Sequence, residues 1–154
     1  MYDSVTVRQV LRSKVNGYWG IGPKATAYDA LELMASKNIG ALLVIDDGKL
    51  VGVFSERDYA RKVILMGKSS KTTMVEDLMS APPIFVNPDL TLRDCMVLMT
   101  ENHVRHLPVM EQGRVMGMVT IGDLVKTIIS EQEKAIEQLE GYISGSDYAG
   151  RTAA

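Results

Sequence analysis

The sequence predicts an α/β (α+β) fold in which two β-α-β-β-α repeats pair about a pseudo-twofold axis and the last helix is extended. Three observations support this: the chain repeats at an offset of 65 residues, each copy alternates strand-like and helix-like patterns, and the final helical pattern outlasts its counterpart. The expected units are residues 5–67 as repeat 1 with its lead-in helix, residues 74–130 as repeat 2, residues 131–143 as a helical extension, and residues 144–154 as a disordered tail.

The two copies align directly without a gap. Residues 21–64 match residues 86–129, and 11 of these 44 pairs are identical. A lead-in segment also recurs, VRQVL at 7–11 and VEDLM at 75–79, at an offset of 68. The changed offset places a length difference in the lead-in loops, where such differences are tolerated.

Each copy begins with a short predicted strand and a helix. The apolar segments YWGI (18–21) and IFV (84–86) meet proline turns, as expected of a strand and its exit. The helix then starts at Thr26 or Thr91, each followed three residues later by Asp in the pattern of a capping box.

The second half of each copy is a predicted hairpin followed by a second helix. Apolar runs flank DDGK (46–49) and EQGR (111–114), of which the Asp-Gly turn is the stronger hairpin signal. The second helices are expected from Glu56 and Ile121. The last one keeps a one-sided apolar pattern as far as Ile143, so its stripe needs cover from this domain or from another subunit.

The composition is that of a globular protein. Hydrophobic residues make up 46% and charged residues 23% of the 154 positions. With 17 basic and 19 acidic side chains, the net charge of −2 offers no basic field for nucleic acid or an anionic membrane. Apolar runs such as 41–45 fall far short of the ~20 residues of a membrane span. The N-terminus lacks the apolar core of a secretory signal, so we expect a cytoplasmic protein.

No constellation of residues indicates an enzyme or a metal centre. The single cysteine, Cys95, lies on the inward stripe of a predicted helix and excludes an internal disulfide. The two histidines, His103 and His106, lack further metal ligands at recognisable spacing. Asp58 and Asp123 could form an acid–base pair, but binding explains them more simply, so we expect no enzymatic activity.

Each predicted hairpin ends in a motif of Gly, two apolar residues, Ser or Thr, and Asp three residues later. Its glycine would let another backbone or a ligand approach the strand. One interpretation is capping by Ser55 and Thr120, with Asp58 and Asp123 in the first turn, where a negative charge is favoured by about 0.3–1 kcal/mol. The other is ligand binding, because a helix N-terminus and a hydroxyl suit a phosphate, and a carboxylate can accept both ribose hydroxyls. The two roles can coexist.

Together, the repeat, the hairpin and this motif resemble CBS domains, named after cystathionine β-synthase. The resemblance covers about residues 5–130, and SERDYARKV, RHLPV and IGDLVK look most like stand-alone bacterial proteins with a tandem CBS pair. It implies a disc-shaped module that binds adenosyl compounds between its repeats and pairs into a homodimer. AMP or NAD(H) is the implied ligand, with ATP and S-adenosylmethionine as further possibilities, and no cofactor is required.

The resemblance also implies a role for individual residues. Asp58 and Asp123 match the ribose-binding carboxylate, and Ser55 and Thr120 match the phosphate-side hydroxyl. Other residues expected at the sites are Thr26, Ala41, Arg57, Thr91, Arg105, His106 and Leu107. For the two threonines at helix starts, capping is nearly as good an explanation.

Cationic residues differ between the copies. Repeat 2 has Arg105 and His106 where repeat 1 has Gly40 and Ala41, and repeat 1 has Arg57 where repeat 2 has glycine. Arginine suits a phosphate because its contact is bidentate, although exposed arginines can also simply be solvated. If pairing brings these residues together, one site gains positive charge and the other gains little.

Two functions remain open at this stage. The first is a regulatory module in signal transduction that senses adenine nucleotides and acts on a partner protein that the sequence does not name. The alternative is a ligand-independent oligomeric interaction module that acts through its surfaces. Nucleotide titration separates the two.

Overall fold

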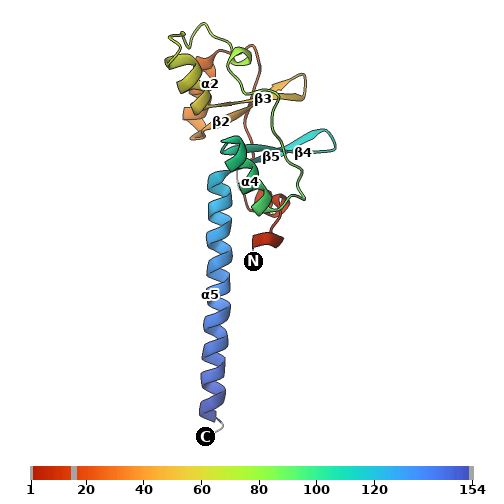
Figure 1. The fold of residues 1–154 in the computed structure, drawn as a ribbon, viewed down its shortest axis with the longest axis vertical. Helices are drawn as coiled ribbons and strands as arrows, with labels where there is room; N and C mark the ends of the chain where they lie inside the picture. The colour runs from red at the N-terminus through yellow and green to blue at the C-terminus, as the bar shows by residue number, and fades with distance from the viewer. Residues whose placement is uncertain (1, 15–16, 153–154) are drawn as a thin grey trace.

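The computed structural model of the chain describes residues 2–14 and 17–152, with side chains described between residues 3 and 143. Its two repeats stack on one another, and one long helix projects from the second (Figure 1). Repeat 1 contains β1 (Gly20–Ile21), α2 (Ala27–Lys37), β2 (Ala41–Asp46), β3 (Lys49–Ser55) and α3 (Glu56–Tyr59), followed by a π-helical turn (Ala60–Ile64). Repeat 2 contains α4 (Leu92–Asn102), β4 (His106–Glu111), β5 (Arg114–Thr120) and α5 (Ile121–Thr152). The lead-ins contain a 3-10 turn (Tyr2–Ser4), α1 (Val7–Ser13) and a second 3-10 turn (Val75–Asp77).

An antiparallel hairpin forms the centre of each repeat. Asp47 and Gly48 have φ angles of 50° and 78°, and Gln112 and Gly113 have 52° and 75°. Positive φ at both turn residues is the geometry that tight hairpins favour, because its twist matches that of the strands. Both hairpins also carry a register irregularity at the equivalent position. The hairpin prediction is therefore confirmed for both copies.

The helices begin where the capping patterns predict. Thr26 Oγ1 accepts a hydrogen bond from the Asp29 amide at 3.1 Å, and the Asp29 carboxylate accepts one from the Thr26 amide at 3.2 Å. Thr91 caps α4 in the same way through its hydroxyl. The second helices start at Glu56 and Ile121, as expected.

The first strand differs between the repeats. In repeat 1, β1 pairs in parallel with β2. In repeat 2, the predicted strand 84–86 is reduced to a single parallel bridge between Val86 and Val109. Prolines stand on both sides of this segment, and proline cannot donate a ladder hydrogen bond. The predicted β-α-β-β-α order therefore holds fully only for repeat 1.

The lead-in segments exchange repeats, which corrects the expected unit of residues 5–67. Val7 on α1 is fully buried in the core of repeat 2, and its amide donates to the Leu90 carbonyl at 2.9 Å. Val75 is fully buried in the core of repeat 1, and its amide donates to the Ala25 carbonyl at 2.8 Å. The offset of 68 shows that a lead-in recurs, but local sequence does not show which repeat it covers.

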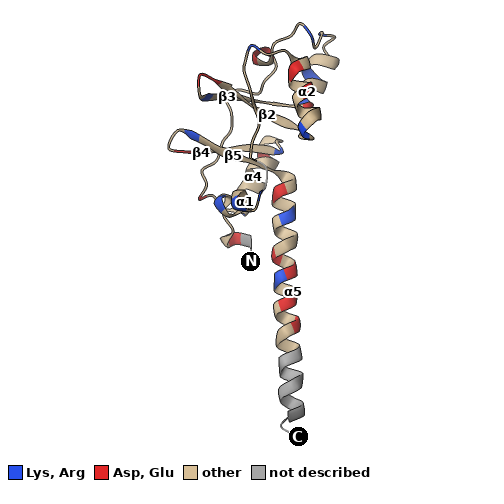
Figure 2. Ribbon diagram, turned by 180° about the vertical axis from the view of Figure 1, so that it is seen from behind, with Lys and Arg blue, Asp and Glu red and all other residues tan. Residues whose placement is uncertain are grey.

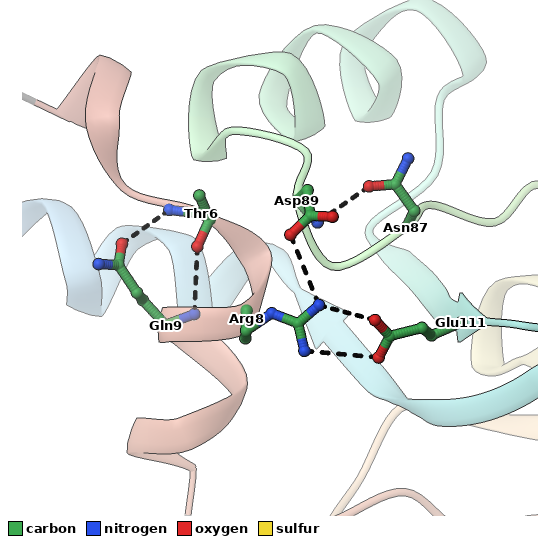
Figure 3. Close-up of polar contacts among 6 residues, drawn as sticks. All are labelled: Thr6, Arg8, Gln9, Asn87, Asp89 and Glu111. Carbon is green, nitrogen blue, oxygen red and sulfur yellow. Dashed lines mark hydrogen bonds and ion pairs between the residues drawn. The ribbon is translucent and has the colours of Figure 1, made fainter.

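Arg8 fastens α1 to the hairpin of repeat 2 (Figure 3). Its guanidinium donates to the two carboxylate oxygens of Glu111 at 2.8 and 3.4 Å and lies 3.5 Å from Asp89. This hydrogen bonding lowers the pKa of Glu111 and raises that of Arg8. Thr6 and Gln9 close a capping box beside it, so the helix start and its contact with repeat 2 are fixed together.

Glycine allows the exchanged lead-ins to lie close to the strands. A Cβ added at Gly52 would lie 2.6 Å from Met79 Sδ and 3.0 Å from the Ser80 carbonyl oxygen. A Cβ added at Gly117 would lie 3.0 Å from Leu11 Cδ2. The close approach expected at these glycines is therefore made by the lead-in of the other repeat.

A third apolar cluster joins the repeats between their hairpins. Ala41 and Leu43 of β2 meet Met118 of β5, and all three side chains are buried. This contact brings the end of one hairpin and the start of the following helix next to the other repeat, which positions the sites described below.

The last helix is longer than expected. α5 continues to Thr152, so the prediction of a disordered tail from residue 144 is wrong for residues 144–152, and residues 153–154 lie outside the described residues. No proline interrupts this segment, and extending an existing helix adds one hydrogen bond per residue without a new nucleation step.

Candidate functional site

A pocket of about 920 Å³, pocket 1, lies where β3 and α3 of repeat 1 meet the turn after α4 of repeat 2. Small-molecule sites usually enclose about 300–1,000 Å³. The walls include five of the residues expected at the sites: Ser55, Arg57, Asp58, Arg105 and His106. Residues that are far apart in sequence and come from both repeats are therefore gathered in one pocket.

Asp58 uses its two carboxylate oxygens differently. Oδ2 accepts hydrogen bonds from the Ser55 amide and hydroxyl, both at 3.0 Å, which completes the capping box of α3. Oδ1 accepts a hydrogen bond from the Ser80 hydroxyl at 3.1 Å and lies 3.3 Å from the Lys62 ammonium. One oxygen therefore holds the helix start, while the other contacts side chains that also line pocket 1.

Pocket 1 has a surplus of positive charge. Its cationic side chains are Arg57, Arg61, Lys62 and Arg105, and its carboxylates are Glu56 and Asp58. Lys62 is paired with Asp58, and Arg57 donates to the backbone carbonyl of His103 at 2.9 Å. Within the described part of the chain, none of the three arginines forms an ion pair with a carboxylate. The expected gathering of cations from both repeats is therefore present, and the arginines can still accept an anion.

The pKa of His106 is lowered from its ordinary value, which favours the neutral imidazole. Its pKa is lowered first by burial and then by the positive charges of Lys14 and Arg105, while Asp123 acts in the opposite direction. The ring lies beside Gly40, where an added Cβ would be 3.5 Å from Nε2. An anion that enters pocket 1 would raise this pKa, so His106 can respond to the charge of a ligand.

The second motif lies in a different pocket, pocket 2, of about 740 Å³ between α1 and α5. Asp123 Oδ2 accepts a hydrogen bond from the Thr120 amide at 2.8 Å and lies 2.9 Å from the Lys14 ammonium. Pocket 2 is also lined by Lys126 and by Lys134, which pairs with a glutamate. Contrary to expectation, this site is not poor in positive charge, but two of its three lysines already have carboxylate partners.

Five of the expected site residues line neither pocket, and one of them is Thr120, whose hydroxyl accepts a hydrogen bond from the Asp123 amide at 3.1 Å. Thr26 and Thr91 serve as helix caps, as their alternative interpretation proposed. Ala41 and Leu107 are fully buried in β2 and β4. Their side chains belong to the packing of the module, and Gly40 lines pocket 1 next to Ala41.

Sequence reasoning missed several residues that complete the sites. Ser80 and Lys62 hold Asp58, Arg61 lines pocket 1, and Lys14 holds Asp123. Lys62 could have been found, because a lysine four residues after an aspartate lies on the same helix face. Ser80 and Lys14 could not, because they reach the aspartates only through the exchange of lead-ins.

Metal ligands are not clustered in the described chain. Within residues 2–14 and 17–152, no three His, Cys, Asp or Glu side chains come together in a way that could hold a metal ion. The same part of the chain contains no helix with the length and apolar character required to cross a membrane.

A family model settles which fold family these two motifs belong to. The CBS domain model matches the chain twice, at residues 17–64 and 75–130. The chain belongs to the CBS domain family. The double match confirms the tandem CBS pair predicted from the repeat, and the two pockets lie where the CBS repeats meet each other and the exchanged lead-ins.

Related CBS proteins share both sequence and fold. The CBS domain-containing protein CBSX3, mitochondrial, of Arabidopsis thaliana is 39% identical over an alignment of 153 residues that covers 94% of this chain and 74% of that protein. A CBS-domain structure from Burkholderia ambifaria MC40-6 is 46% identical with a TM-score of 0.79, covering 83% of this chain and 96% of that one. The CBS domain pair of protein MJ0100, solved with 5′-methylthioadenosine and S-adenosyl-L-methionine, has the same fold at 22% identity, with a TM-score of 0.73 over 82% of this chain and 98% of that one.

Proposed function

We propose that this CBS pair is a cytoplasmic regulatory module that binds an adenine nucleotide, AMP or NAD(H), in pocket 1. CBS pairs are regulatory, ligand-binding modules, and their fold admits adenosyl compounds in the MJ0100 structure. The observation that carries the proposal is that pocket 1 combines the Asp58 carboxylate with three arginines that have no carboxylate partner among the described residues.

The ribose would bind at Asp58. Oδ1 exchanges its contacts with Ser80 and Lys62 for the ribose hydroxyls, while Oδ2 keeps the hydrogen bonds from Ser55. The exchange leaves the α3 cap intact, so the ligand does not compete with folding. It also frees the Lys62 ammonium, which adds a further donor for an anionic group.

The phosphate would bind between the repeats. Arg57 of repeat 1 and Arg105 of repeat 2 both line pocket 1, and a guanidinium suits a phosphate because of its bidentate geometry. His106 gains a proton more readily once the anion is present. The module then signals to a partner protein by the presence of nucleotide, with no chemical step.

Calorimetric titration of the full-length protein tests this proposal. The wild type should bind AMP or NAD(H), and Asp58→Asn should lose about 1–3 kcal/mol of binding free energy for both the nucleotide and adenosine, because ribose hydroxyls lose their acceptor. Asp29→Asn is the matched control, since it alters the same capping-box position on α2, away from pocket 1. The proposal fails if the wild type binds neither nucleotide, or if Asp58→Asn binds AMP as tightly as Asp29→Asn does. Preferential binding of S-adenosylmethionine would contradict the ligand class.

A further inference from the structure

The second half of α5 projects away from the two repeats (Figure 1). Leu124 is buried in the core of repeat 2, and Ile128 packs partly against it. Farther along, the apolar side chains are open to water, with Leu139 63% and Tyr142 78% exposed. Because most helical stability in proteins comes from packing an amphipathic face, this part of α5 needs a partner.

Residues of α5 at a seven-residue spacing, apolar except for Gln132 and mostly exposed, form a set that we call the α5 stripe. Its first row is Val125, Gln132 and Leu139; its second row is Ile128, Ala135 and Tyr142; its third row is Ile129, Ile136 and Ile143. In a heptad these are positions a, d and e over three consecutive repeats. A sustained seven-residue spacing is the signature of helices that supercoil around one another.

Charged side chains lie outside the α5 stripe. Figure 2 shows charged residues of both signs along the described part of α5. The charged residues between the end of the first turn and Ile143 are Lys126, Glu131, Glu133, Lys134, Glu137 and Glu140. The stripe itself carries no charge, so it does not select an oppositely charged partner. A helix with the same pattern is its natural complement.

The exposed area fits a second copy of this chain. A stable dimer interface needs about 600–1,000 Å² from each partner. Six large apolar side chains of the stripe are about half exposed or more, which gives an area of that order: Val125, Ile129, Ile136, Leu139, Tyr142 and Ile143. Two identical stripes bury each other without any additional protein.

We propose that α5 pairs with α5 of a second copy as a parallel, in-register coiled coil centred on Gln132. In a parallel pair, position a faces position a, so Gln132 meets the partner's Gln132 and the two amides can hydrogen-bond to each other. In an antiparallel pair, position a faces position d, and Gln132 would meet the methyl group of Ala135. A polar residue at a single a position fixes register in this way at some cost in stability.

Disulfide cross-linking of the full-length protein tests the pairing. Leu139→Cys, at position a, should form a covalent dimer under mild oxidation, and Tyr142→Cys, at position d, should do the same. Glu137→Cys is the matched control, because this exposed residue lies on the opposite face of the same turn. Cys95 adds little background, since it is buried and burial raises its pKa to about 11.

The expected result is cross-linking at least ~10-fold faster at residues 139 and 142 than at residue 137, because a disulfide forms only when two Cα atoms come within about 7 Å. Circular dichroism of each variant checks that the fold is retained. Equal cross-linking at all three positions, or a single-chain mass for the wild type in light scattering at micromolar concentration, would overturn the proposal. So would a cross-link between Gln132→Cys and Ala135→Cys chains that is faster than that of Gln132→Cys with itself, since only the antiparallel pair favours it.

Discussion

At the scale of single residues, the carboxylate of Asp58 combines a helix-capping contact with contacts at the wall of pocket 1. Its Oδ2 accepts both hydrogen bonds from Ser55, and its Oδ1 contacts Ser80 and Lys62 at the wall of pocket 1. Asp123 in repeat 2 occupies the equivalent position, but Lys14 contacts the same oxygen that holds the Thr120 amide. The two equivalent carboxylates are therefore held by different side chains, Asp58 by Ser80 and Lys62 at Oδ1 and Asp123 by Lys14 at Oδ2.

Arg105 is expected to distinguish a phosphate-bearing ligand from adenosine. Arg105→Ala should weaken AMP binding by about 1.5–3 kcal/mol, the value of a charge-assisted hydrogen bond, and leave adenosine binding almost unchanged. Raised salt should also weaken AMP binding more than adenosine binding. Calorimetry with both ligands measures this difference, and Arg93→Ala, an exposed arginine on α4 that lines neither pocket 1 nor pocket 2, is the control. Equal losses of binding free energy for AMP and adenosine would mean that Arg105 supports the shape of pocket 1 without contacting the phosphate.

The lowered pKa of His106 predicts how the free energy of unfolding depends on pH. Burial and nearby cations lower its pKa in the folded protein below the ordinary value of 6.5. Between the folded value and 6.5 the unfolded chain binds more protons, so the free energy of unfolding should fall as the pH falls through this range. Urea unfolding at several pH values should show a smaller decrease for His106→Gln. The control is His103→Asn, which places in repeat 2 the residue that repeat 1 has at the equivalent helix end. An unchanged pH dependence in His106→Gln would contradict this account.

Comparison of the two repeats in the sequence predicts Asp58 and Arg105 at a site, but it does not predict the side chains that contact the aspartates. Asp58 and Arg105 stand out from the sequence, one because it recurs and the other because its counterpart is glycine. Ser80 and Lys14 carry no such signal, because their distance from an aspartate is set by tertiary exchange of the lead-ins. The resemblance to CBS domains implies Ala41 at the site, but its side chain is fully buried in the cluster between the hairpins.

At the scale of elements, helix starts and hairpins follow local chemistry, and elements that depend on distant partners do not. A hydroxyl and a carboxylate three residues apart set the start of α2, and a Gly turn sets each hairpin. The first strand of repeat 2 is reduced to one bridge, because the prolines on either side of it cannot donate hydrogen bonds to a neighbouring strand. The predicted helix ends at residue 143, where its apolar pattern ends, whereas α5 continues to Thr152.

Gly52 should tolerate no side chain, because the exchanged lead-in lies against it. Gly52→Ala places a methyl group 2.6 Å from Met79 Sδ and 3.0 Å from a backbone oxygen, so we expect a loss of ~1–3 kcal/mol in the free energy of unfolding. Gly22→Ala is the control, since an added Cβ there meets no atom within 4 Å. Urea unfolding of both variants gives the comparison. Equal stability of the two variants would mean that residues 79 and 80 of the lead-in do not pack against Gly52.

At the scale of the whole molecule, the exchange makes each CBS repeat depend on the other. Val7 completes the core of repeat 2, and Val75 completes the core of repeat 1. Neither core is closed by its own repeat alone, so separate unfolding of one repeat would expose buried apolar surface in both. The sequence offset predicts two similar units, but their interdependence appears only in three dimensions.

Hydrogen exchange should therefore show a single cooperative unit. The amides of Val7 and Val75, each hydrogen-bonded to a carbonyl of the opposite repeat, should become exposed with the same free energy of opening. Native-state exchange in low urea, followed by NMR, measures both values in one sample. A difference of more than ~1.4 kcal/mol, a tenfold difference in the opening equilibrium, would show that the repeats open independently and that the exchange does not couple them.

The central claim is that pocket 1 holds an adenine nucleotide between the CBS repeats, and a crystal structure of the protein grown with AMP tests it most directly. We predict the ribose hydroxyls within hydrogen-bonding distance of Asp58 Oδ1, with the phosphate between Arg57 and Arg105 and the Ser80 hydroxyl displaced from the carboxylate. Nucleotide seated instead against Asp123 in pocket 2, or an unchanged pocket 1 with Ser80 still bonded to Asp58 at saturating AMP, would contradict the account.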